Sequence, residues 1–191
     1  PTIDEVGPSL YSGDPGNGQT PADVTWGIAM AVRGNLTNAQ IILGSGAYNK
    51  SSRTVAILQA NEYGQFTSTA ITIPDAPDKF ARLGIDWGPG TNTFWGKSVG
   101  NLILCEFDLV AGTGFVKKTY PLTGNRSVAS SITGIRYDRN YNLLAGIQNG
   151  SPPSPVSIPV YNVSDIEAGP MWVDQELFPT YYPDVNYQGN V

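Results

Sequence analysis

The chain has 191 residues, with 22 glycines, 15 prolines and only 14% charged residues. Its net charge is −5 and no basic cluster stands out, which argues against nucleic-acid binding, because phosphate contacts need concentrated Lys and Arg. Histidine is absent, which removes the commonest general base and zinc ligand, and the single cysteine, Cys105, excludes a disulfide within the chain.

Short runs of Val, Ile, Thr and Tyr alternate with Gly, Asn, Asp, Ser and Pro along the whole sequence. This pattern is typical of many short strands joined by turns, so we expect an all-β fold in one domain, residues 1–191. No apolar run approaches the ~20 residues that span a bilayer, so we expect no transmembrane segment.

The strand-like segments recur in chain order as three units of four. The first segments of the units share a Gly-Ile pair, with Gly27, Gly84 and Gly134 spaced by 57 and 50 residues. The segments of the first unit are 24–32, 39–47, 53–61 and 64–73; those of the second are 81–89, 93–101, 102–110 and 114–122; those of the third are 131–139, 142–150, 156–164 and 169–177. The period is therefore near 50 residues.

A period of about 40–50 residues with four strands per unit indicates the blade of a β-propeller, because one meander cannot bury both of its apolar faces alone. The blades would span 24–74, 79–123 and 128–178. Residues 1–23 would supply an outer strand and a linker, and residues 179–191 the start of a further blade. Three blades do not close a ring of the usual four to eight, so the chain would be part of a larger propeller or be completed by other chains. The alternative architecture is a β-sandwich or jelly roll.

The stretch LGIDWGPGTNTFWGKSVGNLILCEFDLVAGTGF (83–115) places a strand-turn-strand before a strand that ends in Asp and a Thr-Gly-type turn. In this it resembles β-propeller repeat proteins of the secreted or cell-surface bacterial type. The resemblance covers residues 24–177 and implies a secreted or cell-surface location. The Trp-Asp and Gly-His pairs of WD40 repeats are missing.

Several residues are candidates for chemistry. Four aspartates at predicted strand ends could ligate calcium or act as an acid/base pair, but Asx turns are the simpler interpretation, so we assign no catalytic residue: Asp86, Asp108, Asp138 and Asp165. Loops 14–23 and 182–190 lack EF-hand spacing, so no metal or other cofactor is expected, with calcium as the alternative. The tryptophans lie in predicted strands and are expected in the core, as is Cys105: Trp26, Trp87, Trp95 and Trp172.

Two groups of residues suit the protein surface. Tyr181, Tyr182 and Tyr187 cluster with prolines in an irregular segment and would form a partner contact or a half-buried packing loop. Asn-x-Ser/Thr sequons, which are candidate glycosylation sites in predicted turns, begin at Asn35, Asn49, Asn125 and Asn162.

Three functions remain open. The first is a non-enzymatic extracellular structural or interaction protein that self-assembles through unpaired terminal strands, with identical copies among its partners. The second is a carbohydrate-binding module, which would take glycans. The third is a propeller hydrolase or lyase that depends on carboxylates. Propellers host all three, so the fold alone does not choose.

Overall fold

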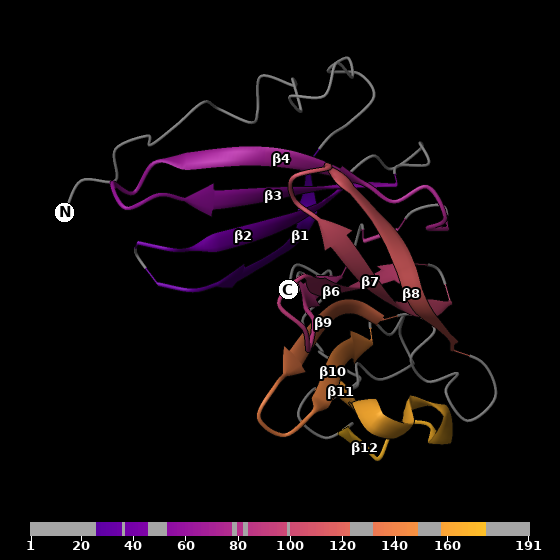
Figure 1. Cartoon of the computed structure of the whole chain (residues 1–191). Coiled ribbons are helices and arrows are strands. Elements are labelled where there is room, and N and C mark those ends of the chain that lie inside the picture. Colours follow the sequence, from indigo (N-terminus) through magenta and orange to yellow (C-terminus); the bar gives the residue numbers. More distant parts are fainter. Residues whose placement is uncertain are drawn as a thin grey trace, which may run out of the picture.

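The structure is a computed structural model that describes residues 26–35, 37–45, 53–77, 80–81, 84–98, 100–122, 132–148 and 158–174. These residues form twelve β-strands and one short 3-10 helix (Figure 1). Each predicted strand segment overlaps one of the strands, with ends that differ by a few residues, which confirms the all-β class.

The strands form three four-stranded antiparallel meanders, each of which pairs strands that follow one another in the chain. The first meander contains β1 (Trp26–Arg33), β2 (Gln40–Ser45), β3 (Thr54–Ala60) and β4 (Phe66–Thr72). The second contains β5 (Ile85–Trp87), β6 (Thr93–Ser98), β7 (Asn101–Asp108) and β8 (Thr113–Pro121). The third contains β9 (Ile132–Asp138), β10 (Leu143–Gln148), β11 (Ile158–Asn162) and β12 (Trp172–Asp174), with the 3-10 helix η3 (Val163–Ala168) before β12.

The first two meanders join into one eight-stranded sheet. Its strand order is β1-β2-β3-β4-β8-β7-β6-β5, and the joint between β4 and β8 is one parallel pair, Thr72 with Thr113. The Thr72 amide donates to the Gly112 carbonyl over 3.1 Å at this joint. At the other end of the sheet, β5 lies against β1 and β2. The sheet is therefore nearly closed, like a flattened barrel.

Two hydrophobic cores hold the meanders together. The first lies between the first and second meanders and is built from alternate strand residues, among them Ile42, Ile57, Phe94 and Phe107. The second lies between the second and third meanders. Its members include Trp95, Tyr120, Leu144, Tyr161 and Leu102. Strands β5 and β6 of the second meander are thus buried on both faces, whereas β8 is largely exposed. Figure 1 shows the second meander between the other two.

Each face of a meander can be named by its neighbour: the rear face looks toward the preceding meander and the front face toward the following one. At the first interface, the front face of the first meander (Ala31, Ile42, Ile57) meets the rear face of the second (Trp87, Phe94, Cys105). At the second interface, the front face of the second meander (Trp95, Leu102, Tyr120) meets the rear face of the third (Tyr137, Leu144, Tyr161). The same kind of contact is used twice.

Asx turns end the third strand of every meander. The Asn61 side chain accepts hydrogen bonds from the amides of Tyr63 and Gln65, and Asp108 accepts from Val110 and Ala111. Asn162 accepts from the Ser164 amide over 2.9 Å and caps η3. These short polar side chains satisfy backbone donors where the strand stops, which is why the chain reverses there. The helical turn η3 replaces the end of a predicted strand, because Asn162 is a good N-cap.

Candidate functional site

The interface between the second and third meanders contains a buried carboxylate, Asp86 on β5. Only 5% of Asp86 is exposed. Its Oδ2 accepts from the Tyr137 amide over 2.7 Å and its Oδ1 from the Trp87 amide over 2.8 Å. The Arg136 guanidinium lies 3.8 Å from Oδ1 but is largely exposed, so this ion pair is weak. Asp86 was expected at a strand end; instead it links two meanders, because β5 is short and packs directly against β9.

The β5–β6 turn receives an arginine from each neighbouring meander. Arg33 of β1 donates from Nη2 to the Thr91 carbonyl over 2.6 Å, and its guanidinium stacks 3.7 Å above the Trp87 ring. Arg139, just after β9, donates from Nη2 to the Gly88 carbonyl over 3.0 Å. Burial and the nearby charge of Arg139 lower the pKa of Arg33. The two arginines thus link the first and third meanders to the same turn of the second meander by hydrogen bonds.

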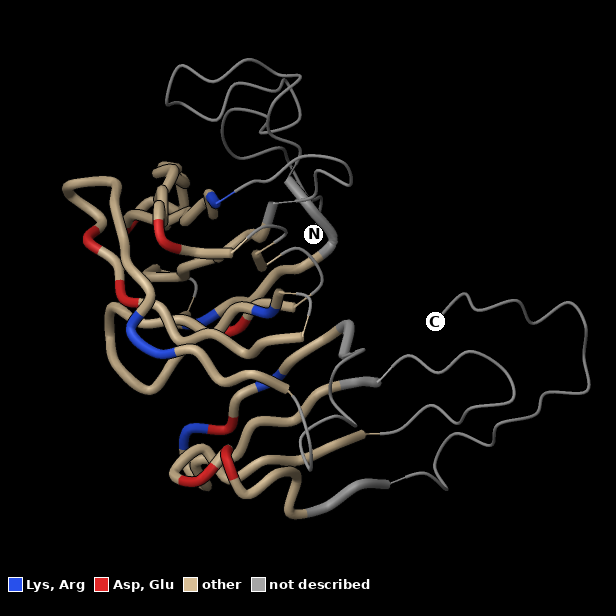
Figure 2. The backbone as a smooth tube through the Cα atoms, turned by 90° about the vertical axis from the view of Figure 1, so that its right-hand side faces the viewer, with Lys and Arg blue, Asp and Glu red and all other residues tan. Residues whose placement is uncertain are grey.

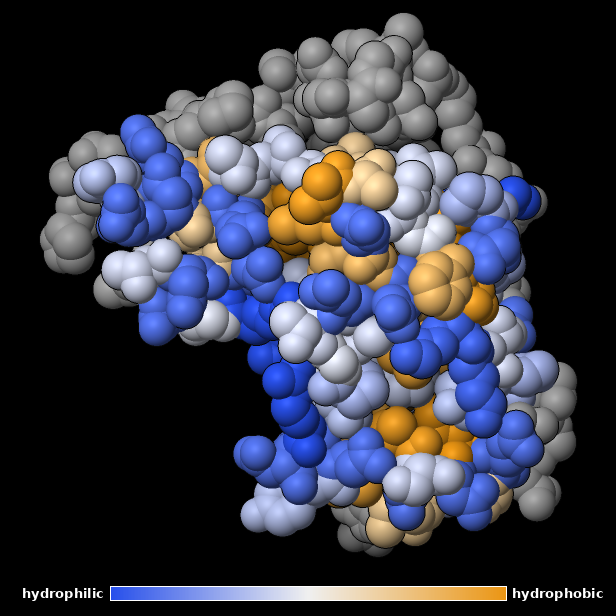
Figure 3. All heavy atoms as spheres, viewed as in Figure 1, coloured by the Kyte–Doolittle hydropathy of each residue, from blue (hydrophilic) through white to orange (hydrophobic). Residues whose placement is uncertain are grey.

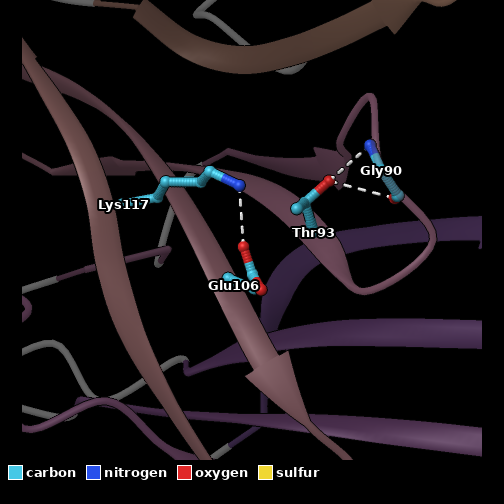
Figure 4. A network of polar contacts seen from close by, with 4 residues as sticks. All are labelled: Gly90, Thr93, Glu106 and Lys117. Carbon is cyan, nitrogen blue, oxygen red and sulfur yellow. Dashed lines mark hydrogen bonds and ion pairs between the residues drawn. The ribbon is translucent and has the colours of Figure 1, made fainter.

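The side chain of Thr93 closes the β5–β6 turn by hydrogen bonds. The Thr93 hydroxyl accepts from the Gly90 amide and donates to the Gly90 carbonyl, over 2.8 and 3.0 Å (Figure 4). The same figure shows Lys117 of β8 reaching Glu106 of β7 over 2.8 Å. The side chains of Lys117 and Glu106 are 51% and 39% exposed, and ion pairs at such exposed positions contribute little to stability.

The remaining candidate aspartates have structural surroundings. Asp108 and Asp138 end β7 and β9, and each Oδ1 accepts two backbone amides of the following turn. Asp165 is exposed within η3. Across the described ranges, no group of three or more His, Cys, Asp or Glu side chains is arranged to hold a metal ion.

The tryptophans and the cysteine lie where the strand pattern places them. Trp87 and Trp95 are 5% and 0% exposed and belong to the first and second cores, respectively. Cys105 is fully buried in the first core, and burial, with a contribution from the charge of Asp75, raises the pKa of its thiol far above the usual range. The side chains of Trp26 and Trp172 lie outside the described part.

An open hollow of about 490 Å³ lies on the front face of the third meander. Its floor is apolar, with Leu143, Ala145 and Val160 from β10 and β11. Its rim carries residues 136–140 of β9 and the following turn, including Arg136 and Asp138. Tyr141, at the tip of the same hairpin, is 76% exposed.

The rear face of the first meander is largely apolar, and among the described strands no further meander packs against it. Two rows of paired residues cross its four strands: Met30, Leu43, Ala56 and Ala70, and Val32, Ile41, Leu58 and Ser68. Met30 is 59% exposed and Val32 49%. Both rows consist of uncharged residues. Elsewhere, basic and acidic residues are interspersed along the backbone (Figure 2). In the view of Figure 3, hydrophobic patches interrupt the polar surface in both the upper and the lower half of the molecule.

The structure describes two of the four candidate glycosylation sites and none of the three candidate contact tyrosines. Asn35 and Asn162 are exposed, and the Asn35 side chain accepts from both the amide and the hydroxyl of Thr37, the third residue of its sequon. Asn49, Asn125, Tyr181, Tyr182 and Tyr187 lie outside the described residues, as do the terminal segments 1–23 and 179–191.

Sequence reasoning missed Arg33, Arg139 and the linking role of Asp86. A usable signal existed, because Asp86 interrupts an apolar strand directly after the repeated Gly-Ile pair. Comparison with known protein families gives no match, and no curated protein matches the sequence. In the parts of the chain that the structure describes, no helix has the length and apolar character needed to cross a membrane.

Proposed function

We propose that the chain is a non-enzymatic extracellular structural or interaction protein, built from propeller-type blades, that assembles with other protein chains, identical copies included. The observation that carries this proposal is the repeated interface. The first and second meanders, and the second and third, pack front face to rear face, with β5 between β1 and β9. Neighbouring blades of a propeller pack in this way around an axis.

Three units of this kind are fewer than the four to eight blades that usually close a propeller. Sequence reasoning assigns residues 1–6 to an outer strand without partners and residues 184–191 to a first strand without followers. A lone strand cannot satisfy its own backbone groups. The N-terminal strand would pair with the edge of the third meander within the chain, or, as we propose, each terminal strand would pair with strands of another chain by backbone hydrogen bonds. Tyr181, Tyr182 and Tyr187 would serve as apolar anchors beside the C-terminal strand. Exposed Asn35 and Asn162 would accept glycans at turns that a secreted or cell-surface protein presents to solvent.

The test is the oligomeric state of the full chain and of a variant that lacks residues 184–191. We expect the full chain to assemble, as measured by light scattering, and the shortened chain to stay folded by circular dichroism but to lose assembly. Deleting residues 1–6 provides a second, independent end. A full chain that is a monodisperse monomer would refute the proposal.

One observation favours carbohydrate binding as a second candidate. The polar residues that line the hollow on the third meander end at Asn140, and the next residue, Tyr141, carries an exposed ring outside the hollow. Aromatic rings can stack on sugar faces. Binding on a glycan array that disappears in Tyr141→Ala, but persists in Tyr63→Ala, would favour this function. Tyr63 is a suitable control because it is equally exposed, at 79%, in a turn of the first meander.

A further inference from the structure

We propose that the rear face of the first meander is a docking surface for the front face of the third meander of a second copy of the chain, so that copies associate head to tail. This inference rests on the proposed function and specifies which surfaces meet. The occupant follows from the internal repeat, because the chain already contains two contacts between a front face and a rear face.

Met30 shows that the β1 side of this face is exposed, whereas Ala56, in the centre of the same row, is only 2% exposed. The repeated glycines Gly27, Gly84 and Gly134 are each followed three residues later by a large side chain: Met30, Trp87 and Tyr137. Trp87 is 5% exposed and packs on the first meander, and Tyr137 packs on the second. Met30, at the same place in its own meander, is 59% exposed.

The strand register extends the comparison across the whole face. The row that contains Met30 runs through Leu43, Ala56 and Ala70, as the row of Trp87 runs through Phe94, Cys105 and Val116. In the second meander this row forms the wall of the first core. In the first meander the row is equally apolar, and an uncharged sheet face of this kind is stabilised by burial.

The complementary surface is the front face of the third meander. In the first two meanders this kind of face is covered by the next unit, and in the third it carries the open hollow above Leu143, Ala145 and Val160. An apolar floor with a polar rim is the composition of a protein interface, and the hollow has room for the side chain of Met30. Because the two surfaces differ, the contact is heterologous, and it generates a ring or a filament rather than a symmetric dimer.

The experiment uses one variant on each surface of the full chain. Val32→Asp places a charge on the rear face of the first meander, and Ala145→Asp places one in the hollow of the third. Val110→Asp is the matched control, because Val110 is fully exposed in the β7–β8 turn. Circular dichroism checks that each variant folds, and Met30→Lys and Leu143→Lys replace any that does not.

We expect the wild-type chain and Val110→Asp to form assemblies that grow with concentration, and Val32→Asp and Ala145→Asp each to have the mass of one chain, 20.4 kDa. An equimolar mixture of the two surface variants should form a 1:1 dimer and nothing larger, because only one pair of intact surfaces remains. Mixtures that stay monomeric, or an equal loss of assembly in Val110→Asp, would overturn the inference.

The outcomes also separate this inference from the proposed function. If Val32→Asp and Ala145→Asp assemble like the wild type, while the chain lacking residues 184–191 does not, the terminal strands alone carry assembly and the docking surface is refuted. If the wild-type chain is a monomer at every concentration, other residues of the same chain cover both faces, and both proposals fail.

Discussion

Replacing Asp86 with alanine should uncouple the third meander from the second. The carboxylate accepts two backbone amides, and the bond from the Tyr137 amide, at 2.7 Å, crosses the interface between the meanders. Since Asp86 is only 5% exposed, water cannot readily replace the lost acceptor. A buried donor left unpaired costs about 1–3 kcal/mol of stability. Tyr137 is partly exposed, so water can partly satisfy its amide, and we expect the two donors together to lower the free energy of unfolding by about 2–4 kcal/mol.

The assay is urea or thermal unfolding followed by circular dichroism. For a chain of this length, each kcal/mol shifts Tm by about 2–4 °C, so Asp86→Ala should lower Tm by about 5–15 °C. The Tm of Asp86→Asn should lie between that of Asp86→Ala and that of the wild type. The amide keeps one acceptor oxygen, but its NH2 group faces the second backbone donor.

Asp138→Ala is the matched control for this experiment. Asp138 also accepts two backbone amides, from Asn140 and Tyr141, but it is exposed and acts within one hairpin. Water replaces its oxygens, so the free energy of unfolding should change little. An equal loss of stability in Asp86→Ala and Asp138→Ala would refute the role of Asp86 as a link between meanders.

Three further predictions concern the cores. Ile85→Ala should lower the free energy of unfolding by about 2–5 kcal/mol, because Ile85 is 3% exposed in the first core; a change no larger than that of Val110→Ala would contradict this. Gly96→Ala should lower the free energy of unfolding by about 1–3 kcal/mol, because the added methyl group would clash with the Phe80 ring. The double variant Gly96→Ala, Phe80→Leu should regain part of this stability if the ring is the obstacle. Cys105 should react with a bulky thiol reagent slowly in the native state and rapidly in urea, and equal rates would place it at the surface. Because burial raises the pKa of the Cys105 thiol, only the unfolded chain loses this proton as the pH rises above the ordinary thiol pKa of about 9. The free energy of unfolding should therefore fall with rising pH, by at most about 1.4 kcal/mol per pH unit. This pH dependence should be absent from Cys105→Ala.

The strands could be predicted because their signals are local. Ile85 and Ile135 follow the repeated glycines, and both are buried, at 3% and 9%, on the first strand of their meanders. Asp108 marks the end of β7 by itself, since its side chain binds the amides of the next turn. Alternation and turn residues act within a few residues of chain, so sequence alone carries them.

The contacts between meanders could not be predicted in the same way. Asp86 and Tyr137 are 51 residues apart, and so are Gly88 and Arg139. An aspartate in a short strand is consistent with an exposed end or with a buried link, and only the position of β9 decides between them. Arg33 is a similar case, because its stacking on Trp87 depends on how two meanders face each other.

The central position of the second meander, which shares one core with each of its two neighbours, has a consequence for how the molecule opens. When units contact only their neighbours, stability is close to a sum of unit terms and interface terms, so a unit with two neighbours is the last to unfold. The amides of β6 and β7 would therefore exchange with solvent only in global unfolding, whereas β10 and β11 need the loss of just one interface. Thermal fluctuation thus releases the outer units first and presents their inner surfaces to any neighbouring molecule, while the centre stays folded.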